Sequence, residues 1–194
     1  MATTLAQITV EQFEQMPEAD EGFELVDGVL VERQMAHSDH EVVKSALTRL
    51  IGARLDPDRF ELFVEAQHKV SPTSSRVPDL AVWSATDLDS VVLGRTLNRA
   101  PLMAIEVVSS ERAADLQYKI SQYFEAGTEL VWSVYPKTRV VLAQWRDRHS
   151  VEYRSGDILD TGNVVPGLAF SVNEIFARLI RLEAAAANQQ RTPK

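Results

Sequence analysis

The segment that most limits how this chain can fold runs from Leu102 to Val108 and is apolar except for Glu106. A short apolar run of this kind is typical of a strand buried inside a sheet. Burying an isolated carboxylate is costly, so Glu106 must be paired, hydrogen-bonded, bound to a metal or placed at the open end of the sheet. One alternative remains open at this point, which is an edge strand whose carboxylate points into solvent.

Helices and strands surround this segment without a regular alternation. Thr9 and Gln12 form a capping-box pattern for a short helix that Pro17 ends, and Asp27-Gly28 predicts a tight hairpin turn. Periodicity predicts further helices over 38–55, 113–126 and 172–187, and strands over 23–26, 29–32, 60–70, 77–83, 102–108, 130–134, 140–145 and 151–153, with a turn at 71–75 and a polar connection over 87–100. This order predicts an α+β (mixed α/β) domain, with a central mixed sheet flanked by helices and an N-terminal β-hairpin.

The length of 194 residues fits one domain, and the eight glycines and eight prolines are scattered rather than gathered in a linker. We therefore predict a single domain over 1–187 and a frayed tail over 188–194. No stretch approaches the ~18–20 apolar residues of a membrane-spanning helix, and the first residues lack the pattern of a signal peptide. These features predict a cytoplasmic protein that does not contact membranes.

The absence of cysteine excludes disulfides, thiolate metal sites and cysteine nucleophiles. Any metal must be held by carboxylates, carbonyls or the four histidines. The formal net charge is −8, and residues 1–36 carry eight acids and one base, so the rest of the chain is nearly neutral. This balance does not indicate tight non-specific binding of nucleic acid, but it leaves room for a local basic surface.

A second carboxylate and a lysine join Glu106 as candidate functional groups. Asp79 follows Pro78 where a predicted strand begins, so it is either an ordinary turn residue or one of two carboxylates at strand ends that share a hard cation such as Mg²⁺. Lys119 lies on the helix after the Glu106 strand. It either pairs with Asp115 on a solvated face or reaches an attacking water or a phosphate.

These residues belong to a series of short motifs. The series consists of Pro78-Asp79, Glu106-Val107-Val108-Ser109, Asp115-x-x-x-Lys119-x-x-x-Tyr123-x-x-x-Gly127, Trp132 and Pro136. Together they resemble the Uma-two endonucleases, a branch of the PD-(D/E)XK restriction-endonuclease-like superfamily. The resemblance extends upstream through the hairpin at 24–28 and the helix headed by His40, and so covers about Thr9 to Ala169.

The resemblance implies a restriction-endonuclease-like fold and a Mg²⁺-dependent (or Mn²⁺-dependent) DNA endonuclease. Asp79, Glu106 and the backbone carbonyl of Val107 would hold the metal, and Lys119 would complete the catalytic set. The superfamily usually places its lysine two residues after the glutamate, where this chain has Val108. In the Uma-two branch the lysine lies on the following helix, and Lys119 matches that place.

The chain departs from the family pattern at three points. Ser110 replaces a proline, the segment before Asp115 is one residue shorter, and Tyr135 replaces an acid. The resemblance also suggests auxiliary roles for Glu24, His40 and Asp115, although Glu24 also fits a solvated hairpin position and His40 a capping or surface position.

Arg95 and Arg99 are candidates for phosphate contacts, or else ordinary surface charges. Nucleases of this superfamily often act as dimers that cut both DNA strands, so the resemblance further implies a homodimer.

Three functions therefore remain in competition. The first is a Mg²⁺-dependent DNA endonuclease. The second is a catalytically silent module that binds nucleic acid or protein on the same fold, which the charge of −8 favours. The third is an enzyme that uses the same metal site on another phosphorylated substrate. The intact set of Asp79, Glu106 and Lys119 favours activity over pure binding.

Overall fold

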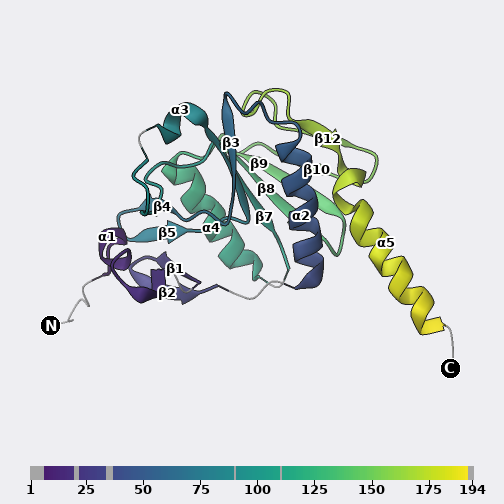
Figure 1. Cartoon of the computed structure of the whole chain (residues 1–194), viewed down its shortest axis with the longest axis horizontal. Coiled ribbons are helices and arrows are strands. Elements are labelled where there is room, and N and C mark those ends of the chain that lie inside the picture. Colours follow the sequence, from purple (N-terminus) through teal and green to yellow (C-terminus); the bar gives the residue numbers. More distant parts are fainter. Residues whose placement is uncertain (1–6, 20–21, 34–36, 90, 110, 192–194) are drawn as a thin grey trace.

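The computed structural model describes residues 7–19, 22–33, 37–89, 91–109 and 111–191 (Figure 1). The helices are α1 (Val10–Phe13), η1 (Pro17–Ala19), α2 (Ser38–Gly52), α3 (Ala85–Leu88), α4 (Ala113–Ala126) and α5 (Val172–Arg191). The strands are β1 (Phe23–Val26), β2 (Val29–Glu32), β3 (Phe60–Val64), β4 (His68–Ser71), β5 (Ser74–Arg76), β6 (Leu80–Ser84), β7 (Met103–Val107), β8 (Leu130–Tyr135), β9 (Val140–Trp145), β10 (Ser150–Tyr153), β11 (Ile158–Asp160) and β12 (Ala169–Ser171). Within these described ranges, no helix is both long and apolar enough to cross a membrane.

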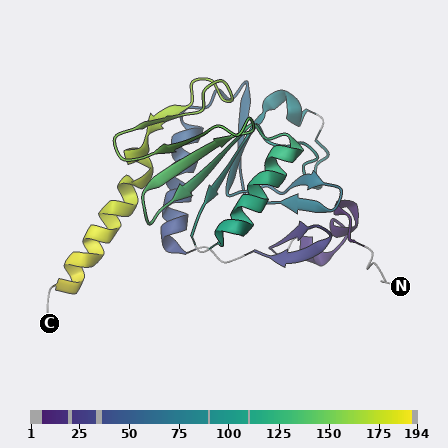
Figure 2. The ribbon, with the colours of Figure 1, turned by 180° about the vertical axis from the view of Figure 1, so that it is seen from behind.

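A six-stranded mixed sheet forms the centre of the molecule, in the order β10-β9-β8-β7-β6-β3. Strands β7 and β8 are parallel and the other neighbours are antiparallel. Helix α4 makes the crossover between the two parallel strands and covers one face of the sheet, while α2 and α5 cover the other face (Figures 1 and 2). The fold class predicted from the sequence, a central mixed sheet flanked by helices, is confirmed.

The two faces of the sheet bury different residues because successive side chains of a strand point to opposite faces. On β7, Met103, Ile105 and Val107 join the larger core beneath α2 and α5, whereas Ala104 joins the smaller core beneath α4. The same alternation directs Glu106 toward α4. On β6, Leu80 belongs to the larger core, so the residue before it, Asp79, also falls on the α4 side.

A smaller antiparallel sheet, β2-β1-β5-β4, packs beside α4 and carries the predicted hairpin. Asp27 and Gly28 have φ angles of 51° and 77°, which is the conformation of a type I′ turn. Strand β1 also pairs with β5 through Leu25 and Ser75. The hairpin is thereby held against the segment that leads into Asp79.

The structure corrects the predicted strand over 60–70. This segment forms two strands that belong to different sheets, because Glu65 adopts a left-handed conformation with φ of 53° and breaks the run. The segment 71–75, predicted as a turn, also contains the start of β5, and this strand pairs with both β1 and β4. Local composition predicted the turn correctly but not the pairing that follows it.

Several element boundaries also differ from the prediction. Helix α2 takes His37 as its N-cap, without a side-chain hydrogen bond, and ends at Gly52 rather than near residue 55. Helix α5 continues to Arg191, so the tail predicted to be frayed is helical that far, and 192–194 lie outside the described residues. The polar connection begins with the short helix α3, and β11 and β12 were not predicted.

Gly127 ends α4 in the left-handed conformation that the sequence predicts, with φ of 120°. A Cβ atom there would lie 3.7 Å from the Cβ of Ala100, an ordinary contact, so the cost of a side chain is a backbone cost. We expect Gly127→Ala to lower the free energy of unfolding by about 1–2 kcal/mol, measured by chemical denaturation.

Gly52→Ala is the matched control, because Gly52 is the last residue of α2, has no positive φ angle, and a Cβ atom added there would meet nothing within 4 Å. This change is expected to stabilise the protein by roughly 0.5–1 kcal/mol. Equal losses in the two variants would contradict the assignment of a backbone cost to Gly127.

Candidate functional site

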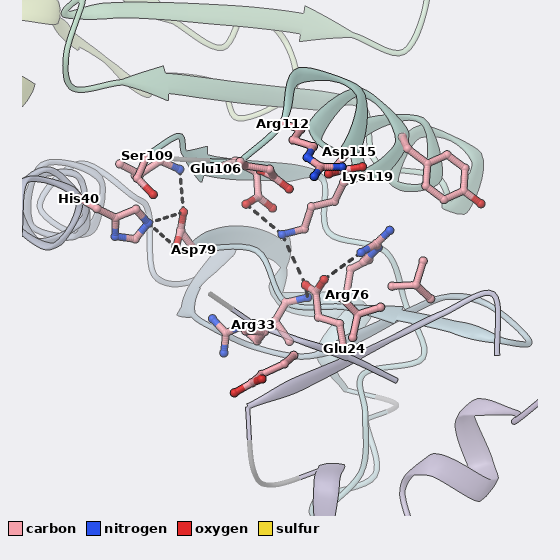
Figure 3. Close-up of a pocket in the computed structure, with 17 residues that line it drawn as sticks. Glu24, Arg33, His40, Arg76, Asp79, Glu106, Ser109, Arg112, Asp115 and Lys119 are labelled. Carbon is pink, nitrogen blue, oxygen red and sulfur yellow. Dashed lines mark hydrogen bonds and ion pairs between the residues drawn. The ribbon is translucent and has the colours of Figure 1, made fainter. Parts of the chain in front are cut away.

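Asp79 and Glu106 approach each other where β6 and β7 pair. Leu80 is opposite Ile105 in this antiparallel pair, so continuing the register by one residue places Asp79 opposite Glu106. The Oδ2 atom of Asp79 accepts a hydrogen bond of 2.7 Å from the amide of Val107. Both carboxylates line the same pocket, on the α4 side of the sheet (Figure 3).

His40, in the first turn of α2, faces Asp79. Its Nε2 atom lies 3.0 Å from Oδ1 of Asp79 and 3.1 Å from Oδ2, and its Nδ1 atom lies 3.3 Å from Glu41. Burial alone would lower the pKa of His40, but the hydrogen bond and charge of Asp79 outweigh it and raise that pKa. Burial would raise the pKa of Asp79, but His40 and the Val107 amide hold it below its ordinary value.

Lys119 reaches the same place from α4. Its Nζ atom lies 3.1 Å from Oε2 of Glu106 and 3.4 Å from Oε1 of Glu24, and the side chain is buried (Figure 3). No ion pair with Asp115 is present in the described part of the chain. Burial alone would lower the pKa of Lys119, but Glu106 and Glu24 outweigh that effect and raise it, so the ammonium stays charged.

Glu106 is the most deeply desolvated acid of the group. Burial raises its pKa to about 7, an effect that Lys119 opposes and Asp79 reinforces. The hydroxyl of Tyr123 donates a 2.6 Å hydrogen bond to its Oε1 atom. The carboxylate is therefore fixed in position by two donors on α4, at a pKa that leaves it able to gain or lose a proton near neutral pH.

Glu24 is held by a separate set of donors on the opposite wall. The Nη1 atom of Arg76 donates to Oε2 at 2.9 Å, and the amide of Val77 donates to Oε1 at 2.8 Å. Arg76 also donates to Gln122 of α4 at 2.7 Å. Burial would raise the pKa of Glu24, but Lys119, Arg76 and these hydrogen bonds outweigh it and lower that pKa.

The pocket around these groups has a volume of about 520 Å³. Its acidic lining residues are Glu24, Glu32, Asp79, Glu106, Glu111 and Asp115, and its basic lining residues are Arg33, Arg76, Arg112 and Lys119. The lining thus carries a formal excess of two negative charges with His40 neutral. An anionic substrate would be repelled from such a floor without a further cation.

The carboxylates of Asp79 and Glu106 could supply only some of the ligands that Mg²⁺ requires. Among the residues that the structure describes, no group of three or more His, Asp or Glu side chains is arranged to hold a metal. Mg²⁺ is nevertheless commonly held by one or two carboxylates, with waters and substrate oxygens as its other ligands. Two hard oxygen donors at the floor of an acidic pocket fit that chemistry.

The structure brings together most of the residues singled out in the sequence. Asp79, Glu106, Lys119, Val107, Glu24, His40 and Asp115 all line the pocket. Arg95 does not: it lies 3.7 Å from Glu14 and lines a separate pocket of about 430 Å³. Arg99 lines neither pocket, and its carbonyl accepts a hydrogen bond from Trp83.

Sequence reasoning missed Arg76, Gln122 and Arg112. For Gln122 a signal existed, because Asp115, Lys119 and Gln122 follow one another at helical spacing on one face of α4. Arg76 lies in a short polar strand that composition assigns to a turn, so no local signal marks it as buried. Arg112 is the N-cap residue of α4 and lines the pocket.

Comparisons with known proteins agree with this description. The Uma2 family, described as "Putative restriction endonuclease", matches residues 10–173, so the family resemblance seen in the sequence is confirmed. A solved structure described as a putative nuclease belonging to DUF820, from Anabaena variabilis ATCC 29413, superposes with a TM-score of 0.77. It is 20% identical, with 89% of this chain and 99% of that chain covered, and at this identity it shows the fold alone. No curated protein matches the chain.

Proposed function

Since this chain belongs to the Uma2 family of putative restriction endonucleases, we propose that it is a DNA endonuclease that hydrolyses phosphodiester bonds with Mg²⁺ or Mn²⁺. The observation that carries the proposal is the meeting of Asp79, Glu106 and Lys119 in one pocket. These residues come from the position just before β6, from β7 and from α4, and nothing in the packing of the core requires a buried lysine between two acids. Burying such groups costs stability, and clusters of buried ionisable residues are therefore found mostly at functional sites.

In this proposal Asp79, Glu106 and the carbonyl of Val107 hold the cation. The chemistry that Mg²⁺ or Mn²⁺ supplies when bound is activation of water and stabilisation of negative charge on the phosphate. His40 keeps the carboxylate of Asp79 ionised and oriented through its Nε2 atom. The Val107 amide fixes the same carboxylate from the other side.

Lys119 supplies a permanent positive charge beside the acids. Its Nζ atom is held between Glu106 and Glu24, so the ammonium does not need to reorganise when a phosphate enters. A preorganised cation of this kind stabilises charge that develops in the transition state, or orients the attacking water. Tyr123 keeps Glu106 from rotating away from this arrangement.

Metal dependence is the direct test of the proposal. Purified protein at low ionic strength should nick supercoiled plasmid DNA in Mg²⁺ or Mn²⁺, because phosphate binding by an acidic chain weakens steeply with salt. EDTA should abolish the nicking, and excess Mg²⁺ should restore it, as followed by gel electrophoresis. Absence of cleavage of any DNA or RNA under these conditions would favour the catalytically silent module instead.

A further inference from the structure

One wall of the pocket carries an exposed aromatic ring that the proposed hydrolysis does not use. Tyr118 precedes Lys119 on α4 and lines the same pocket, and 45% of its surface is exposed. Lys119 points to the acids, while Tyr118 is one residue earlier on the helix and so faces the rim. An exposed aromatic side chain beside a buried charged centre is available to contact a substrate.

The ring of Tyr118 is held in place although it is exposed. Its hydroxyl donates a 2.6 Å hydrogen bond to Oδ2 of Asp27, at the turn of the β1–β2 hairpin. The other carboxylate oxygen of Asp27 accepts a hydrogen bond of 3.2 Å from the hydroxyl of Ser74. The amide of Asp27 donates to the same hydroxyl at 2.8 Å. The acceptor is therefore itself fixed, and the ring loses little conformational entropy when a ligand packs on it.

Apolar and cationic groups line the same pocket as this ring. Val26 and Val31 of the hairpin line the pocket with Tyr118, and 43% of the surface of Val31 is exposed. Arg33 and Arg112 also line it; Arg33 lies 3.6 Å from Glu65, and within the described ranges Arg112 forms no ion pair. The pocket thus combines an apolar wall with cations that suit a phosphate next to an apolar, flat group.

We propose, on the basis of the nuclease function above, that Tyr118 stacks on an unpaired nucleobase next to the phosphate that is cut, so that the substrate is single-stranded DNA or an unpaired end. Nucleobases offer a flat face to an aromatic ring only when they are not stacked within a duplex. Proteins that follow an intact duplex instead present many Lys and Arg side chains to its phosphates. This pocket has six acidic and four basic lining residues, and a single stacked base with one or two phosphate contacts fits it better.

A second role for Tyr118 must be distinguished from stacking. The bond between Tyr118 and Asp27 also connects α4 to the hairpin, and this connection alone would make the residue structural. Tyr118→Phe removes the hydrogen bond and keeps the ring, whereas Tyr118→Ala removes both. If Tyr118 stacks on a base, the Tyr118→Phe variant should still interact with nucleic acid. If Tyr118 only connects α4 to the hairpin, the Phe and Ala variants should lose that interaction equally.

The test compares one oligonucleotide as a single strand and in a duplex, with initial cleavage rates in Mg²⁺. We expect the single strand to be cut at least about tenfold faster by the wild type. Tyr118→Ala should slow cleavage of the single strand about tenfold more than it slows cleavage of the duplex, while Tyr118→Phe stays close to the wild type on both substrates. Leu93→Ala is the control, because Leu93 is 92% exposed and outside the pocket.

A binding measurement separates failure of this inference from failure of the proposed function. The probe is a single strand that contains 2-aminopurine, whose fluorescence falls when the base stacks, titrated at low salt in EDTA. Quenching that is lost in Tyr118→Ala and kept in Tyr118→Phe would support the inference even if nothing is cleaved. Equal cleavage of single strand and duplex, or equal loss in the Phe and Ala variants, would overturn it while leaving the nuclease proposal intact. Absence of both cleavage and quenching would overturn both.

Discussion

Glu106→Gln should reduce DNA cleavage by roughly a hundredfold to a thousandfold, the size of effect seen when one preorganised electrostatic group is removed from an active site. The substitution keeps the shape of the side chain and removes the negative charge proposed to hold the cation. Lys119 and Tyr123 would each still contact a polar atom of the substituted side chain. The measurement is the initial rate of plasmid nicking in Mg²⁺, at equal concentrations of variant and wild type.

The same substitution should leave the fold intact. Because burial raises the pKa of Glu106 to about 7, its ionised form destabilises the folded state. That cost grows as the pH rises from the ordinary carboxyl range to about 7 and is constant above it, so the stability of Glu106→Gln relative to the wild type should rise over that pH range. Thermal unfolding at several pH values checks this expectation.

Glu125→Gln is the matched control, since Glu125 is exposed on α4 and does not line the pocket. It should cleave like the wild type. Equal cleavage by Glu106→Gln and the wild type would indicate that a contaminating nuclease, and not this site, cuts the DNA. A variant that loses activity together with its cooperative unfolding would be tested again as Glu106→Asp, which keeps the charge and shortens the side chain.

Local patterns in the sequence single out Glu106 and Asp79 as candidates, and the family resemblance implies that Lys119 joins them. A single charge in the apolar run 102–108 marked Glu106, and the period of two along a strand places it on one face of the sheet. Pro78 marked the strand end at Asp79. The helical spacing that ends at Gly127 fixed the limits of α4, and with them the position of Lys119.

The remainder depends on contacts between distant segments, which no local pattern encodes. Arg76 contacts Glu24 and Gln122 across separations of 52 and 46 residues, through a three-residue strand that composition assigns to a turn. The division of 60–70 into β3 and β4 follows from pairing with β6 and β5, not from the hydrophobicity of the segment. Only the charge of Arg95 and Arg99 favours phosphate contacts, and packing places both outside the pocket of Asp79 and Glu106.

Arg76→Ala should lower the free energy of unfolding by about 3 kcal/mol, because it leaves the buried carboxylate of Glu24 without its closest cation. Both side chains of this pair are buried, at 8% exposure each. Arg146→Ala removes an ion pair with Glu129 in which both side chains are about half exposed. This change should lower the free energy of unfolding by less than about 1 kcal/mol. Chemical denaturation of the two variants gives the comparison.

The pH dependence of this loss identifies its cause. Burial would raise the pKa of Glu24, but Lys119, Arg76 and the Val77 amide together lower it, so Glu24 contributes stability above its ordinary pKa, and that contribution is lost as the pH falls through the lowered value. Arg76→Ala should therefore lose less stability than the wild type on acidification, and the two curves should converge at low pH. Adding Glu24→Gln to Arg76→Ala should recover part of the loss at neutral pH. A loss that is independent of pH and is not recovered in the double variant would instead assign it to the packing of Arg76 and to its hydrogen bond with Gln122.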